Sequence, residues 1–123
     1  MKISLTIYNE HLPQVQTVLK DCDLIFIPAG YSKGRIERVI AEFRTKTVCL
    51  SQIGQSEIIL EYLQGTSLTS LASRFGLGQA DITELETIKA SLPKNIELEL
   101  YTKNCFFSDI PEPKPIIIKI NDY

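Results

Sequence analysis

The sequence predicts an α/β protein made of three consecutive segments, and three patterns carry this prediction. Short apolar strands alternate with amphipathic helices over residues 1–53. A strand, two helices and a second strand fit residues 57–101, and a proline-rich connector followed by an isoleucine-rich strand fits residues 102–123. Because alternating strands and helices favour parallel strands joined by crossovers, we expect residues 1–53 to form a β-α-β-α-β unit.

The elements of this first unit follow from the spacing of its apolar residues and its capping residues. A proline is tolerated in the first turn of a helix, so Pro13 does not argue against a helix that begins just before it. The expected elements are a strand over 2–7 with one buried face, a helix opened by Asn9 and Glu10, a strand over 24–28 covered on both faces, a helix capped by Ser32, and a strand over 45–50.

The turn from the second strand to the second helix is a candidate anion site. Backbone N–H groups and the helix dipole can hold an anion at such a turn, and two basic side chains add positive charge. The spacing matches neither the P-loop nor the dinucleotide fingerprint, so a tight turn without a ligand stays open as the alternative. The residues of this candidate site are Gly30, Ser32, Lys33, Gly34 and Arg35.

The second segment is expected to be a βααβ unit. Ile58–Leu63 is expected to be a strand that pairs antiparallel with Ile96–Leu100, and Gly65 makes the turn after it. Ser67 caps a helix that Gly76 ends, and a second helix begins near Asp81. The expected core of the unit consists of Leu71, Phe75 and Leu85.

This segment resembles the lysin-motif (LysM) domain, a βααβ module that usually binds N-acetylglucosamine-containing glycans such as peptidoglycan. The likeness lies in the run from Gly65 to Leu68, in the helix ending at Gly76, and in the run from Leu92 to Leu100. The chain departs from the family at Glu86, where Asn is usual, and at Asn95-Ile96, where Gly-Gln is usual. The resemblance implies binding at the turns, with Gly65, Thr66, Ser67 and Asn95 as candidate residues.

A helix-turn-helix is the rival interpretation of the same segment. Ala72, Gly76, Leu77, Ile82 and Leu85 stand at the offsets of that motif, and residues 56–63 would then be a leading helix. Charge argues against DNA readout, because the second helix carries Asp81, Glu84 and Glu86 against only Lys89. The whole chain has a net charge of −2 and a pI near 5.4, whereas nucleic-acid binding usually requires a basic surface.

The C-terminal segment combines a connector with a strand. Residues 110–115 alternate proline with other residues and are expected to be an extended, semi-rigid connector. Ile116–Ile120 is strongly β-prone and is expected to complete a sheet with both of its faces covered. The strand either joins the protein's own sheet or is donated to a neighbouring subunit.

Composition and motifs exclude several classes of function. No apolar run reaches the length of a membrane span, and the N-terminus has no secretory signal pattern, so we expect a cytoplasmic protein. The three cysteines are widely spaced and the single histidine is His11, which indicates neither a disulfide framework nor a metal site. No catalytic motif is present. The sequence therefore predicts a non-enzymatic protein without a cofactor or metal.

The expected function is a binding or assembly module with a LysM-like unit. The resemblance suggests two settings, a structural component of a phage tail or injection machine and a peptidoglycan-associated protein. Protein partners or self-association are expected, a glycan ligand stays open, and neither duplex DNA nor a membrane is expected. A helix-turn-helix DNA-binding regulator is the first alternative, and an anion- or nucleotide-binding α/β domain is the second.

Overall fold

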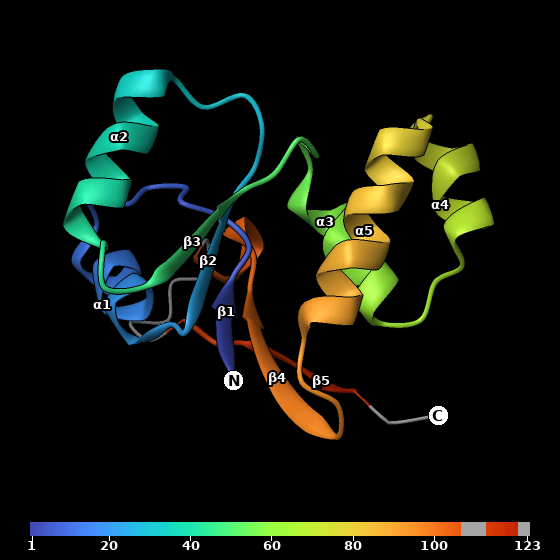
Figure 1. Ribbon diagram of the computed structural model, residues 1–123. Helices are drawn as coiled ribbons and strands as arrows, with labels where there is room; N and C mark the ends of the chain where they lie inside the picture. The colour runs from blue at the N-terminus through green and yellow to red at the C-terminus, as the bar shows by residue number, and fades with distance from the viewer. Residues whose placement is uncertain (107–112, 121–123) are drawn as a thin grey trace.

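The computed structural model describes residues 1–106 and 113–120, which form a mixed α/β arrangement around one five-stranded sheet (Figure 1). The order across the sheet is β3-β2-β1-β4-β5. The first four strands run parallel, and β5 runs antiparallel to β4. The strands are β1 (Lys2–Ser4), β2 (Leu24–Ile27), β3 (Thr47–Leu50), β4 (Ile96–Tyr101) and β5 (Ile116–Ile120). Strands from all three sequence segments therefore share one sheet.

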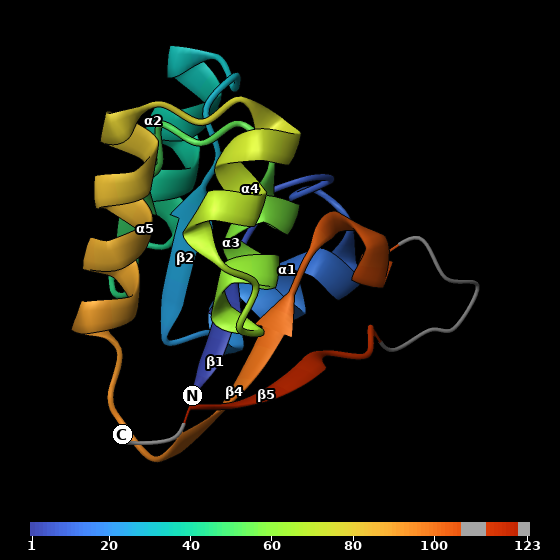
Figure 2. The same ribbon diagram turned by 90° about the vertical axis from the view of Figure 1, so that its right-hand side faces the viewer.

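Helices cover both faces of the sheet. Helices α1 (Pro13–Asp21) and α2 (Lys33–Glu42) lie on one face (Figure 1). Helices α3 (Ser56–Leu63), α4 (Leu68–Phe75) and α5 (Gln79–Ser91) lie on the other, with α4 farther from the sheet than α3 (Figures 1 and 2). A short 3-10 helix, η1 (Lys103–Phe106), follows β4. In the described ranges, no helix has both the length and the apolar composition needed to cross a bilayer.

Two apolar clusters, one on each face, form the core. Successive side chains of a strand point to opposite faces, so Leu24 and Phe26 join the cluster under α3, α4 and α5, while Ile25 and Ile27 join the cluster under α1 and α2. The prediction that this strand is covered on both faces is confirmed. The one-faced prediction for residues 2–7 was wrong. The strand is shorter, Lys2–Ser4, and Ser4 is also buried because β1 occupies the centre of the sheet; Thr6, which follows the strand, is buried too.

The predicted strand at Ile58–Leu63 is instead helix α3, and β4 pairs with β1 and β5. A short apolar run suits a buried strand and a buried helix equally, and here the tertiary packing selects the helix. Ile59 and Leu63, four residues apart, bury the same face. Gly65 ends α3 at φ +103°, where the Thr66 N–H donates to the Glu61 carbonyl at 3.0 Å. The βααβ order expected over 57–101 is therefore replaced by three helices and a strand.

The two helices expected after Gly65 are present. The Ser67 hydroxyl accepts from the Ser70 N–H and caps α4, and Gly76 ends that helix in the left-handed region. Leu71 and Leu85 are fully buried, as predicted, whereas Phe75 packs against the core while remaining half-buried. Phe75 is therefore a boundary residue of the core.

The start of α1 also differs from the prediction. The helix begins at Pro13, not at Asn9 and Glu10, because Asn9 adopts φ +56° in a turn whose carbonyl accepts from the Leu12 N–H. Glu10 is buried and bonded to Arg35. A residue expected to open a helix thus serves a tertiary contact instead.

The C-terminal strand joins the protein's own sheet, since β5 pairs with β4 along its whole length. Only one of its faces is covered. Ile118 and Ile120 are buried, but Ile117 is 52 % exposed, so the prediction of two covered faces was wrong. Strand β5 lies at the sheet margin, where no helix covers the face that carries Ile117. The connector predicted over 110–115 falls partly on residues 107–112, which lie outside the described residues.

Candidate functional site

The sheet reverses its strand order at β1. The chain passes from β1 to β2 and β3 on one side, then returns to β4 on the other side of β1. The loops after β2 and β3 lead to α2 and α3 on opposite faces of the sheet, and an open α/β sheet binds ligands in the crevice between such diverging loops at the carboxyl ends of its strands. The strand order alone therefore predicts a binding site at this edge of the sheet.

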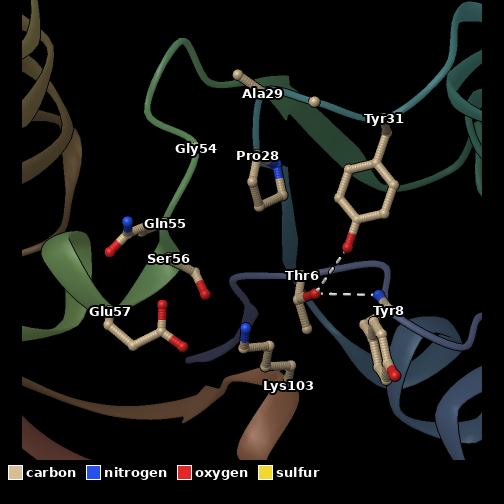
Figure 3. A pocket seen from close by; sticks show the side chains of 11 residues that line it. Thr6, Tyr8, Pro28, Ala29, Tyr31, Gly54, Gln55, Ser56, Glu57 and Lys103 are labelled. Carbon is tan, nitrogen blue, oxygen red and sulfur yellow. Dashed lines mark hydrogen bonds between the residues drawn. The ribbon is translucent and has the colours of Figure 1, made fainter.

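A cavity of about 240 Å³ occupies this edge (Figure 3). All four parallel strands contribute to it through the segments that follow their carboxyl ends. Figure 3 shows the side chains of the β3–α3 loop facing those that follow β1 and β4. The lining residues are Thr6, Tyr8, Pro28, Ala29, Gly30, Tyr31, Gly54, Gln55, Ser56, Glu57 and Lys103.

The N-terminus of α3 forms one wall of this cavity. Gln55 stands at the N-cap position, but its side chain makes no capping hydrogen bond. The first N–H groups of a helix have no intrahelical acceptor, so those of Ser56 and Glu57 are left for an outside partner. The hydroxyl of Ser56 is available as well. It bonds to none of the described residues, and although the residue is only 5 % exposed, this oxygen belongs to the exposed part, because no fully buried side-chain oxygen among the described residues lacks a partner. This hydroxyl points into the cavity (Figure 3).

The loop before α3 is fixed from a distance by α5. The Glu84 carboxylate accepts from the Gln52 N–H at 3.1 Å and from the Ser51 hydroxyl at 3.2 Å. The Ser51 hydroxyl accepts in turn from the Ile53 N–H. The Ile53 carbonyl accepts from the Ala29 N–H, which ties this loop to the loop after β2. The position of the α3 N-terminus therefore depends on an acidic residue that would otherwise be taken for part of a solvated helix face.

An ion pair between the buried Glu10 and the partly exposed Arg35 supports the opposite wall. The Arg35 Nε donates to both carboxylate oxygens of Glu10, at 2.8 and 3.0 Å, and the guanidinium lies 4.6 Å from the centre of the Tyr31 ring. Burial acts to raise the pKa of the Glu10 carboxyl, but the hydrogen bonds and charge of Arg35 hold that pKa below its usual value. The Tyr31 hydroxyl lies 3.4 Å from the Thr6 Oγ1. This contact and the stacked Arg35 guanidinium together hold Tyr31 in the cavity wall.

Two opposite charges line the same cavity. Glu57 comes from the first turn of α3, and the exposed Lys103 comes from the segment after β4. Neither side chain forms an ion pair with any residue that the structure describes. In Figure 3 the carboxylate and the ammonium both point toward the space in front of Ser56. The site can therefore offer a cation, an anion and hydroxyl groups to one small molecule.

The predicted anion loop contributes only part of itself to this cavity. Gly30 lines it, but Ser32, Lys33, Gly34 and Arg35 do not. The Ser32 hydroxyl accepts from the Arg35 N–H and caps α2, while the Arg35 side chain serves Glu10. Lys33 is exposed and lies 4.0 Å from Glu37 on the same helix. The polar groups of this loop are largely used within the protein.

The candidate residues taken from the LysM resemblance lie elsewhere. None of Gly65, Thr66, Ser67 and Asn95 lines the cavity at the carboxyl edge. The first three form the turn between α3 and α4, and Asn95 precedes β4 with φ +56°. This is the left-handed conformation, which asparagine tolerates better than most residues. The structure gives these residues turn and capping roles.

A second cavity of about 500 Å³ lies between α5 and the strands β2 and β3. Its walls are mainly apolar, with Leu24, Phe26 and Ile88 among them, and Asp23 and Glu84 at its margin already accept backbone hydrogen bonds. This cavity is larger, but no lysine or arginine lines it, and its acidic side chains are already used within the protein. We therefore place the candidate site at the carboxyl edge.

Burial makes two of the cysteine thiols harder to ionise. Burial, with smaller effects of Asp21 and Asp23, raises the pKa of the Cys22 thiol to about 12. Burial also raises the pKa of Cys49. All three cysteines are free. Within residues 1–106 and 113–120, no group of His, Cys, Asp and Glu side chains is arranged to hold a metal ion.

Sequence reasoning missed most of this site. The candidates did not include Thr6, Tyr8, Ser56, Glu57 and Lys103, although Tyr8 and Lys103 follow predicted strands and Ser56 and Glu57 begin α3. The available signal was the position of polar residues after consecutive parallel strands, which meet at one edge. That signal was hidden for Ser56 and Glu57 because residues 58–63 were expected to be a strand. No family model matches the chain, and no curated protein or solved structure matches it.

Proposed function

We propose that this chain binds a small molecule through an oxyanion, a carboxylate or a phosphate, in the cavity at the carboxyl edge of the sheet. The Ser56 hydroxyl carries the proposal, because it belongs to a residue that is 5 % exposed, has no partner among the described residues and points into the cavity. An oxyanion would accept from this hydroxyl and from the open N–H groups of α3. Lys103 would add a charge from the opposite side.

The Ser56 hydroxyl differs from the other serines at helix starts in its hydrogen bonding. It is in contact with the cavity, so it can donate to a ligand without breaking a bond within the described structure. In this chain the serines that begin α2 and α4 both accept a backbone hydrogen bond. Ser56 differs in this respect and also faces a cavity. A bound oxyanion would supply the partner that the protein lacks.

A titration of the ¹⁵N-labelled protein tests the proposal. Sodium phosphate and sodium acetate are added at constant ionic strength, with sodium chloride as the control for screening. We expect saturable shifts of the Ser56 and Glu57 amides, with an affinity reduced at least about fivefold in Ser56→Ala. Ser67→Ala is the matched variant, because it removes a serine that caps a helix outside the cavity, and it should bind as the parent does.

Two results would contradict the proposal. Shifts centred on residues 33–35 would place the anion at the loop predicted from sequence instead. Shifts at Ser56 that chloride reproduces in full would indicate screening and not binding.

The proposal takes up the anion-binding alternative and leaves the other expected functions as predictions. Glycan binding loses the first strand on which the LysM resemblance depends, since residues 56–63 form α3. DNA readout gains little support, because Arg74 is paired with Glu61 and α5 presents several acidic residues. Assembly with a protein partner, as in a phage tail or injection machine, is independent of the cavity and stays a prediction.

A further inference from the structure

The cavity proposed above for an oxyanion also contains a carboxylate. Glu57 lies in the first turn of α3, directly after Ser56, and its carboxylate points to the same space (Figure 3). Two unit charges about 4 Å apart interact by roughly 4 kcal/mol near a protein surface. A simple anion seated on the α3 N-terminus would therefore be repelled by Glu57. The arrangement suits a ligand whose anionic group stands beside a cationic one.

The charges of the cavity balance. Glu57 and Lys103 are the acidic and basic side chains that line it, and neither is paired with any described residue. A ligand that satisfies both carries one positive and one negative group and is neutral overall. Ser56 and Glu57 are consecutive, so a donor set and an acceptor lie side by side. The α-carbon of an amino acid joins a carboxylate to an ammonium at a comparably short separation.

The rest of the cavity fits the side chain of such a ligand. Pro28 and Ala29 form an apolar wall, and Tyr8 and Tyr31 add aromatic rings to it. Arg35 lies over Tyr31 and is fixed by Glu10, so that ring is held in place before any ligand arrives. A volume of about 240 Å³ is below the usual range for drug-sized ligands and suits a single small metabolite.

Resting on the proposed function, we infer that the ligand is a free α-amino acid with an apolar or aromatic side chain. Its carboxylate accepts from the Ser56 hydroxyl and the first N–H groups of α3, with Lys103 nearby. Its ammonium donates to the Glu57 carboxylate. Its side chain packs against Pro28, Ala29 and the tyrosine rings.

Three probes that differ in one charge each test the inference. L-phenylalanine carries both groups, N-acetyl-L-phenylalanine lacks the ammonium, and L-phenylalaninamide lacks the carboxylate. NMR titrations that follow the Ser56 and Glu57 amides give their dissociation constants at pH 6.5. We expect L-phenylalanine to bind at least about tenfold more tightly than either analogue.

Glu57→Gln isolates the contact with the ammonium. In this variant the preference for L-phenylalanine over its N-acetyl analogue should fall to about one, and binding of inorganic phosphate should strengthen because the repulsion is gone. Glu86→Gln, an exposed acid on α5 outside the cavity, should change neither result. Thermal unfolding of both variants verifies that they are folded.

The outcomes separate this inference from the proposed function. Equal affinity for L-phenylalanine and N-acetyl-L-phenylalanine in the parent would overturn the amino-acid assignment, and so would an unchanged preference in Glu57→Gln. In either case, saturable phosphate binding at Ser56 would leave the oxyanion proposal standing. If neither phosphate nor any of the three probes binds, both are wrong.

Discussion

The loop from β2 to α2 and the loop from β3 to α3 lie at the same edge of the sheet but use their polar groups in opposite ways. The first has glycines, a serine and two basic residues, and its serine and arginine are both bonded within the protein. The second has a serine whose hydroxyl lacks a partner and a helix start without a side-chain cap. The second loop therefore keeps a serine hydroxyl available for a ligand, which the first loop does not.

Residue type alone therefore does not identify a binding loop. Ser32 and Ser56 both stand at the start of a helix that follows a parallel strand. Ser32 occupies the N-cap position of α2 and accepts a backbone hydrogen bond there. Ser56 is the first residue of α3, one position after the N-cap, so it cannot cap that helix. A ligand can bind where polar groups have no partner within the protein. Whether a group has such a partner depends on its position relative to the helix start and on contacts with distant residues such as Glu10.

Loss of the ion pair between Arg35 of the first loop and Glu10 should have the largest effect on the stability of the protein. Arg35→Gln leaves the Glu10 carboxylate, in a residue that is 4 % exposed, without its cation. Removing one partner of a buried pair usually costs about 3–5 kcal/mol, and partial exposure of Arg35 places the expected loss near the lower limit. Urea denaturation should therefore show a free energy of unfolding reduced by about 3 kcal/mol.

Arg38→Gln provides the control, because Arg38 lies exposed on the same helix and forms no ion pair with a described residue. Its loss should change the free energy of unfolding by less than about 0.5 kcal/mol. If Arg35→Gln were as mild as Arg38→Gln, the ion pair would not be a fixed part of the first loop. Arg35 would then be available to an anion, as the sequence predicted.

The element order of the first fifty residues followed from local patterns, because each element there has its own apolar periodicity. The expected β-α-β-α-β order is present, and Ser32 caps α2 as predicted. The error at residues 58–63 has a physical cause. Eight residues with consecutive isoleucines satisfy a buried strand and a short helix alike, and the choice depends on packing against Leu71 and Leu85, which local sequence does not specify.

The candidate site was less accessible to sequence analysis than the fold. Its lining comes from four segments separated along the chain, and their meeting depends on a strand order that places β4 beside β1. Without that strand order, nothing in the sequence indicates that Lys103 and Thr6 lie close together. The buried state of Ser56 likewise depends on the correct assignment of α3. Composition could exclude classes of function, but it could not bring these groups together.

An intermediate effect is expected from the glycines of the two loops. Gly30 in the first loop has φ +105°, which a residue with a Cβ rarely adopts, so Gly30→Ala should destabilise the protein by about 1–3 kcal/mol. Gly54 in the second loop has no positive φ, and an added Cβ would lie 3.8 Å from the Ala29 carbonyl oxygen, an ordinary contact. Gly54→Ala should leave thermal stability unchanged or slightly raised. A larger loss at Gly54 than at Gly30 would reverse the assignment of which loop is conformationally constrained.

The smallest and most direct test exchanges the two serines for alanine. Ser32→Ala removes a capping acceptor and should lower the free energy of unfolding by about 1 kcal/mol in urea denaturation. Ser56→Ala removes a hydroxyl that stabilises nothing in the described structure, so it should change that free energy by less than about 0.5 kcal/mol.

Ligand binding should show the reverse order of effects. Because the Ser56 hydroxyl points into the cavity and that of Ser32 does not line it, phosphate affinity should fall in Ser56→Ala and stay unchanged in Ser32→Ala. A protein in which both substitutions cost the same stability and neither alters binding would have two structural loops and no ligand site at this edge. If the first loop is structural and the second binds a ligand, Ser32→Ala should lower stability without changing affinity. Ser56→Ala should lower affinity without changing stability.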